Sequence, residues 1–202
     1  MTKIKLCGLS RYYDIEAANE LKPEYIGFVF ASKSKRYITP EKAGNLKRLL
    51  DPCIKAAGVF VNEVPENIAH LLKSGTIDII QLHGNEDETY IKKMRQFTDR
   101  PIIKAFRIQS VSDMEVINGC AADYVLLDSG AGTGTIFDWN LTQSIKRPYF
   151  LAGGLGIDNV KTAVNLLHPF AVDVSSGIET NGAKDKTKMA AFVAAVRKED
   201  KL

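Results

Sequence analysis

Short apolar segments alternate with longer amphipathic segments along the whole chain, and this alternation limits the possible folds more than any other feature of the sequence. Eight of the short segments are rich in β-branched residues and are predicted to be strands. They are Ile4–Cys7, Tyr25–Phe30, Ile54–Val61, Ile77–Leu82, Ile102–Phe106, Tyr124–Asp128, Tyr149–Ala152 and Ala171–Val174. Between them, segments such as Thr39-Pro40-Glu41 have the chemistry of a helix start, an N-cap residue followed by proline.

The predicted strands are almost continuously apolar, which is typical of a sheet covered on both faces. Alternation of strands with helices makes such a sheet parallel. An open doubly wound sheet is the alternative, but it more often stops at about five or six strands, whereas eight units of about 25 residues fit a minimal barrel. We therefore predict an α/β protein, a single (β/α)8 TIM-barrel catalytic domain with eight parallel strands over residues 1–202.

Composition excludes several classes of partner. The net charge of +3 is spread among acidic residues, without the clustered basic face of a nucleic-acid binder. The longest apolar runs are far shorter than the ~20 residues of a spanning helix, and the N-terminus lacks the apolar core of a signal peptide. The three cysteines form no CxxC pair, and the three histidines have no metal-ligand spacing. We expect a cytoplasmic protein without a membrane, nucleic-acid or metal partner.

In a parallel barrel the active site forms where strands end, so polar residues and glycines at those ends are the candidates. Gly153 and Gly154 follow the seventh predicted strand, and Ser176-Gly177 follow the eighth. Backbone N–H groups at such positions, together with the dipole of a short helix, favour an anion. The alternative is that the two glycines only permit a tight left-handed turn. We predict a phosphate site formed by both ends.

Two ionisable residues end predicted strands on other parts of the ring. Cys7 ends the first strand; a lone thiol in an apolar run is usually a structural core residue, but at this end it can point into the cleft. Nearby positive charge would then raise its thiolate fraction. Asp128 follows a strongly apolar strand, where burial is expected to raise its pKa as a general acid requires, unless it is an N-cap or an ion-pair partner. Asp173, inside the eighth strand, is interpreted as structural.

Further candidates lie in the loops. Arg36 follows the second strand and can bind a substrate carboxylate with two hydrogen bonds, although it can also be a solvated loop charge. Gln81 and His83, at the end of the fourth strand, are candidates for lining the pocket, and a structural role for His83 is the alternative. The glycine-rich run 130–134 lacks the third glycine of a dinucleotide fingerprint and is interpreted as a flexible loop rather than a cofactor site.

Six groups of residues, most of them at strand ends, form a specific combination that spans nearly the whole chain. They are Lys5–Leu9; Gly27–Phe30 with Ser34 and Arg36; Gln81–Glu86; Leu126–Ser129 with Gly132–Gly134 and Phe137–Trp139; Leu151–Leu155; and Val172–Glu179 with Gly182, Lys184 and Asp185. Taken together they resemble phosphoribosylanthranilate isomerase, an enzyme of tryptophan biosynthesis.

The resemblance implies an Amadori rearrangement of N-(5′-phosphoribosyl)anthranilate to 1-(2-carboxyphenylamino)-1-deoxyribulose 5-phosphate, with no cofactor. It implies that Asp128 is the general acid that opens the furanose ring and that Cys7 is the general base that removes the C2′ proton. Arg36 would hold the anthranilate carboxylate, and the backbone around Gly154 and Ser176-Gly177 would hold the phosphate. Lys35 and Asn181 replace prolines common in the family, which affects only loop geometry.

Other readings remain as alternatives. The related barrel isomerase of histidine biosynthesis resembles a two-aspartate solution, and Cys7 in place of the first aspartate argues against it. A non-catalytic phosphate-binding barrel would not need both Cys7 and Asp128. A nicotinamide-dependent reductase lacks its fingerprint. The sequence leaves monomer and homodimer equally open.

Overall fold

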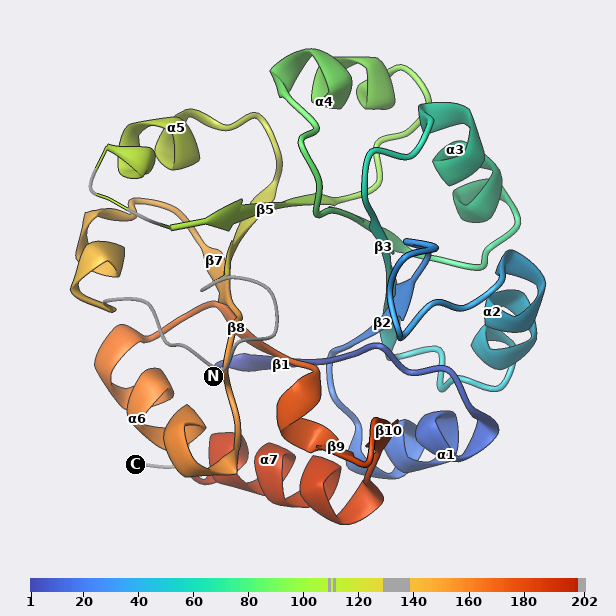
Figure 1. The fold of residues 1–202 in the computed structure, drawn as a ribbon, viewed down its shortest axis with the longest axis vertical. Helices are drawn as coiled ribbons and strands as arrows, with labels where there is room; N and C mark the ends of the chain where they lie inside the picture. Colours follow the sequence, from blue (N-terminus) through green and yellow to red (C-terminus); the bar gives the residue numbers. More distant parts are fainter. Residues whose placement is uncertain (109, 111, 129–138, 200–202) are drawn as a thin grey trace.

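Eight parallel strands close into a barrel that is surrounded by helices (Figure 1). The structure is a computed structural model, and it describes residues 1–108, 110, 112–128 and 139–199. Each strand pairs with its neighbours in chain order, and β1 pairs with both β2 and β8, which closes the ring. The strands are β1 (Lys3–Cys7), β2 (Tyr25–Val29), β3 (Lys55–Phe60), β4 (Ile79–Leu82), β5 (Ile102–Arg107), β6 (Tyr124–Asp128), β7 (Tyr149–Leu151) and β8 (Ala171–Val174). The predicted TIM barrel is confirmed.

Helices occupy the connections on the outside of the ring. They are α1 (Tyr12–Leu21), α2 (Pro40–Lys47), α3 (Pro65–Lys73), α4 (Glu88–Arg95), α5 (Asp113–Gly119), α6 (Ile157–Leu167) and α7 (Lys186–Glu199), with 3-10 turns η1 (Trp139–Ser144) and η2 (Ser176–Ile178). In the described part of the β6–β7 connection, η1 stands where the other connections have an α-helix. After β8 the chain also forms a small antiparallel hairpin of β9 (Glu179–Thr180) and β10 (Ala183–Lys184). None of the described helices is long and apolar enough to cross a membrane.

The helix starts follow the local chemistry that the sequence indicates. The Thr39 side chain accepts a hydrogen bond from the Lys42 amide at 3.3 Å, and Pro40 is the first residue of α2. Pro65 starts α3 in the same way. A proline at this position loses nothing, because the first amides of a helix have no partner within it. These starts fix where each strand-to-helix loop ends.

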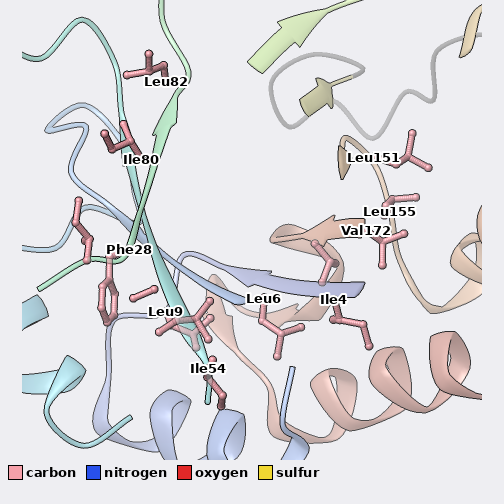
Figure 2. Packing of buried hydrophobic residues seen from close by; sticks show 14 of the residues in the cluster. Ile4, Leu6, Leu9, Phe28, Ile54, Ile80, Leu82, Leu151, Leu155 and Val172 are labelled. Carbon is pink, nitrogen blue, oxygen red and sulfur yellow. The ribbon is translucent and has the colours of Figure 1, made fainter. Parts of the chain in front are cut away.

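Alternate residues of each strand face two different cores. Outward residues pack under the helices; Figure 2 shows Ile4 and Leu6 of β1 pointing toward this helical layer. Inward residues such as Ala57, Ile103 and Leu126 form a second cluster inside the barrel. Because side chains two residues apart on a strand point to the same side, the residue two positions before a strand end shows which way the last side chain points.

Two predicted strands begin later in the structure than in the sequence pattern. Ile54 and Ile77 are both buried, yet each lies before its strand. The Ile54 amide donates to the Asp51 carbonyl in the preceding turn, and the Ile77 amide donates to the Leu71 carbonyl in α3, rather than to a neighbouring strand. Burial in the outer core therefore explains their apolar character without a place in the sheet.

Candidate active site

Cys7 and Asp128 end β1 and β6 and belong to the inward-facing set of residues. Lys5, two residues before Cys7, lies inside the barrel, and Leu126, two residues before Asp128, belongs to the inner cluster. The period of two then turns Cys7 and Asp128 to the same interior, at the carboxyl ends of the strands. The two residues that were predicted to share a cleft thus share the barrel mouth.

Gly27 of β2 provides the space that Cys7 and Lys5 occupy. A methyl group at position 27 would lie 2.7 Å from the Cys7 sulfur and 3.2 Å from Lys5 Nζ. Both atoms therefore lie close to the position that a Cβ atom of residue 27 would take, and only glycine fits at this position. Burial raises the pKa of the Cys7 thiol above its ordinary value; the positive charges of Lys5 and Lys184 oppose this effect, and Asp173 adds to it.

Lys5 is fully buried and forms an ion pair with Asp173 of β8. Its Nζ lies 3.0 Å from Oδ1 and 2.9 Å from Oδ2. Burial opposes the charge of this ammonium, but the charges of Asp173 and Cys7 outweigh it, so the pKa of Lys5 is raised. This role of Lys5 is not predicted from the sequence pattern. The signal was its spacing of two from Cys7, which places both on one face of the strand.

Asp128 contacts His83 at the end of β4. His83 Nε2 lies 3.2 Å from Asp128 Oδ2, and the other ring nitrogen lies 3.0 Å from Nε2 of Gln81. A cavity of about 650 Å³ opens beside this pair and is lined also by Asn62, Lys104 and Arg107, among others. Gln81, His83 and Asp128 therefore form one continuous polar row.

A buried ion pair fixes the loop that follows His83. Lys104 of β5 donates to the Gly84 carbonyl at 2.7 Å and to Glu86 at 3.0 Å. Glu86 in turn accepts from the amides of Asn62 and Gly84. A carboxylate that accepts two amides and an ammonium is a strong anchor because each bond is charge-assisted. Glu86 belonged to the resemblance only, and its loop-holding contacts were not predicted.

Arg36 is already paired within the protein. Its Nε and one terminal nitrogen donate to the two carboxylate oxygens of Glu179 at 2.6 and 2.8 Å. The Arg36 side chain passes over Gly8, where a methyl group would lie 2.5 Å from Arg36 Cδ. Gly8 also has a φ of +80°. The guanidinium is therefore held close to the end of β1, with one of its two edges used by Glu179.

The predicted phosphate residues lie where the loops after β7 and β8 meet. Gly153 and Gly154 have φ values of +82° and +65°, so the left-handed turn considered for them is present. A methyl group at Gly177 would lie 2.1 Å from the Leu155 carbonyl oxygen, so the loop carrying Ser176 and Gly177 packs directly against the loop after β7. The two loops thus form one surface of backbone groups, and the turn does not exclude an anion there.

The glycine-rich run 130–134, Ser129 and the pair Phe137-Asp138 lie outside the described residues. The predicted loop character of the run therefore stays a prediction.

Comparison with known proteins identifies the family. The family model described as "N-(5'phosphoribosyl)anthranilate (PRA) isomerase" matches residues 4–195. The chain belongs to this isomerase family. The isomerase of Endomicrobium trichonymphae is 44% identical to it over 202 residues, which cover 98% of this chain and 99% of the relative.

Solved structures of phosphoribosylanthranilate isomerases have the same fold. One, in complex with reduced 1-(o-carboxyphenylamino)-1-deoxyribulose 5-phosphate, is 35% identical, with a TM-score of 0.86 over 98% of this chain and 100% of the other. Another describes monomers generated from the dimeric isomerase of Thermotoga maritima; it is 36% identical, with a TM-score of 0.86 and the same coverage. The isomerase family resemblance found in the sequence is confirmed.

Proposed function

We propose that this protein isomerises N-(5′-phosphoribosyl)anthranilate to 1-(2-carboxyphenylamino)-1-deoxyribulose 5-phosphate, a step of tryptophan biosynthesis, with Asp128 as general acid and Cys7 as general base. The observation that carries the assignment of roles is the shared inward orientation of these two side chains at the ends of β1 and β6. The ligand in the solved relative is a reduced form of this product, which supports the substrate.

The reaction needs one proton donated and one removed. Asp128 in its acid form gives a proton to the furanose ring oxygen, the C1′–O bond breaks, and the nitrogen lone pair forms a C1′=N iminium. The iminium acidifies the C2′ hydrogen, so a thiolate at Cys7 is a sufficient base. The C2′–H electron pair becomes the C1′=C2′ bond and the iminium becomes a neutral amine. The resulting enol then tautomerises to the ketone.

The remaining candidates either bind the substrate or hold Asp128 in position in this proposal. The edge of Arg36 that Glu179 leaves open receives the anthranilate carboxylate, because a guanidinium can serve two carboxylates from two edges. The backbone at Gly153, Gly154, Ser176 and Gly177 receives the 5′-phosphate. His83 holds Asp128 in position, and Gln81 orients the His83 ring.

The substrate class is a small phosphorylated aminosugar, and we expect the enzyme to work in the cytoplasm. One solved relative is described as dimeric, which supports a homodimer over a monomer for this chain. Sedimentation of the purified protein at micromolar concentration distinguishes the two states.

The test is a fluorescence assay that follows consumption of phosphoribosylanthranilate in the absence of metals and nucleotides. Asp128→Asn and Cys7→Ala should each lower kcat by at least ~10²-fold with little change in KM, because each removes a proton-transfer group. Cys53→Ala, which changes an exposed thiol, is the matched control and should be unaffected. Near-wild-type turnover in either site variant would remove that residue from the mechanism.

A further inference from the structure

The hairpin of β9 and β10 carries two charged residues that the mechanism above does not use. The Lys184 side chain is only 2% exposed, and its Nζ contacts Glu179 Oε1 at 2.6 Å. The same Nζ donates to the Ser175 carbonyl at 2.9 Å and lies 3.2 Å from the Ser175 hydroxyl. A lysine with three donors has all of them occupied by these contacts. Lys184 is therefore fixed in one place at the end of β8.

The hairpin reaches the end of β1 through Ser175. The Ser175 hydroxyl donates to the carbonyl of Cys7 at 3.1 Å, while it also contacts Lys184. The Lys184 backbone is held from the other side, because its carbonyl accepts from Arg11 in the segment that leads into α1. In Figure 1 the hairpin lies beside α1. Lys184 is thus linked through Ser175 to the backbone of Cys7, close enough for its charge to act on the Cys7 thiol.

The same hairpin also holds Arg36, the proposed ligand of the substrate carboxylate. Glu179 binds both Arg36, through two nitrogens, and Lys184. The pKa of Glu179 is lowered; burial opposes this, and the hydrogen bonds from Arg36 and Lys184 outweigh the burial. The carboxylate thus bridges a group assigned to substrate binding and a group beside the thiol.

Charged groups near Cys7 come from β1, from β8, from the loop after β2 and from the hairpin of β9 and β10. On its own strand is Lys5, and on β8 is Asp173, whose carboxylate offsets only part of the effect of Lys5 on the thiol. Beyond them lies the cluster of Arg36, Glu179 and Lys184, which contains two cations and one carboxylate. This cluster therefore adds one net positive charge to that of Lys5. Burial lowers the pKa of Lys184, and the charges of Glu179 and Cys7 oppose that effect without cancelling it.

We propose that Lys184 and Glu179 are positioning residues of the isomerase reaction: Lys184 adds to Lys5 a second positive charge that favours the Cys7 thiolate, and Glu179 holds both Lys184 and Arg36. This inference rests on the proposed function for its catalytic meaning. Binding of the substrate carboxylate and formation of the base are linked in this arrangement, because both depend on one carboxylate, that of Glu179.

The test measures the thiol directly and does not need turnover. In a Cys53→Ser/Cys120→Ala background Cys7 is the only thiol, since the chain has three cysteines. The ultraviolet absorbance of the thiolate, taken as a difference from the Cys7→Ala protein, gives its titration. Lys184→Met should lower the thiolate fraction at neutral pH by at least about threefold, and Glu179→Gln should raise it, because the two substitutions remove charges of opposite sign.

Four further measurements separate a charge effect from a structural one. Lys184→Arg keeps the charge and should restore most of the thiolate. Lys186→Met, on the same segment but exposed and paired with Glu20, is the matched control and should leave the titration unchanged. Thermal unfolding identifies any variant that has lost its fold. If Lys184→Met does not fold, the isosteric substitution Glu179→Gln still tests the charge cluster. In the isomerase assay, Glu179→Gln should also raise KM at least about threefold, because Arg36 loses its bidentate partner.

An unchanged thiol titration in a folded Lys184→Met protein, or shifts of the same sign in Lys184→Met and Glu179→Gln, would overturn the inference. If instead the wild-type protein does not turn over phosphoribosylanthranilate while the two variants shift the titration in opposite directions, the proposed function fails and the charge assignment stands.

Discussion

Replacing Lys5 by methionine should lower both the stability of the barrel and the thiolate fraction of Cys7. The substitution keeps an unbranched side chain only one atom shorter but leaves Asp173 buried without its cation. Removing one partner of a buried ion pair costs about 3–5 kcal/mol of unfolding free energy. For a chain of this length that corresponds to a fall of about 6–20 °C in Tm, measurable by circular dichroism.

The effect on the thiol follows from the geometry at Gly27. The Cys7 sulfur and Lys5 Nζ lie 2.7 and 3.2 Å from the same point, so they are no more than about 6 Å apart. At that separation, and with an effective dielectric constant of about 20, one charge contributes about 2–3 kcal/mol. Loss of Lys5 should therefore lower the thiolate fraction, and with it kcat/KM at neutral pH, by about 30- to 150-fold.

The double variant Lys5→Met/Asp173→Leu is the decisive control. Replacing both partners of a buried pair by apolar residues is often neutral for stability, so Tm should return to within a few degrees of the wild type. Activity should stay low, because the cation beside the thiol is still missing. Recovery of kcat/KM together with Tm would refute the reasoning, since it would show that Lys5 acts only by holding the fold.

Two other substitutions test the binding groups. Arg36→Met should chiefly raise KM with a smaller change in kcat, through loss of a charge-assisted pair, and steady-state kinetics with an unchanged KM would return Arg36 to a structural pairing with Glu179. Gly177→Ala should raise KM and weaken inhibition by inorganic phosphate about tenfold or more, because its methyl group would overlap the Leu155 carbonyl and force the two phosphate loops apart; calorimetric titration with phosphate measures this, and unchanged phosphate affinity would place the anion elsewhere.

The fold followed from local pattern, while the environment of the site did not. Alternation of apolar and amphipathic segments is a property of neighbouring residues, and it was sufficient to predict eight strands and the ends at which Cys7 and Asp128 lie. The strand starts predicted at Ile54 and Ile77 are too early, because burial in the outer core and burial in the sheet produce the same apolar signal.

The partners of the site residues could not be read from spacing. Asp173 is 168 residues from Lys5 in the chain, and Glu179 is 143 residues from Arg36. Such pairs are set by how the ring closes, which no local pattern records. The sequence therefore shows neither that Asp173 pairs with Lys5 nor that Arg36 pairs with Glu179.

The pairing of β1 with β8 has a consequence for how this enzyme is made. The proposed base comes from the first strand of the barrel, and the groups that tune it, Asp173, Ser175 and Lys184, come from the last strand and the hairpin segment that follows it. Until β8 docks, the nascent sheet has two open edges and a buried lysine without its counter-ion. Competence for proton transfer is therefore acquired in the final event of chain closure, and a circular permutation that made β8 and β1 neighbours in sequence would be expected to bring it forward.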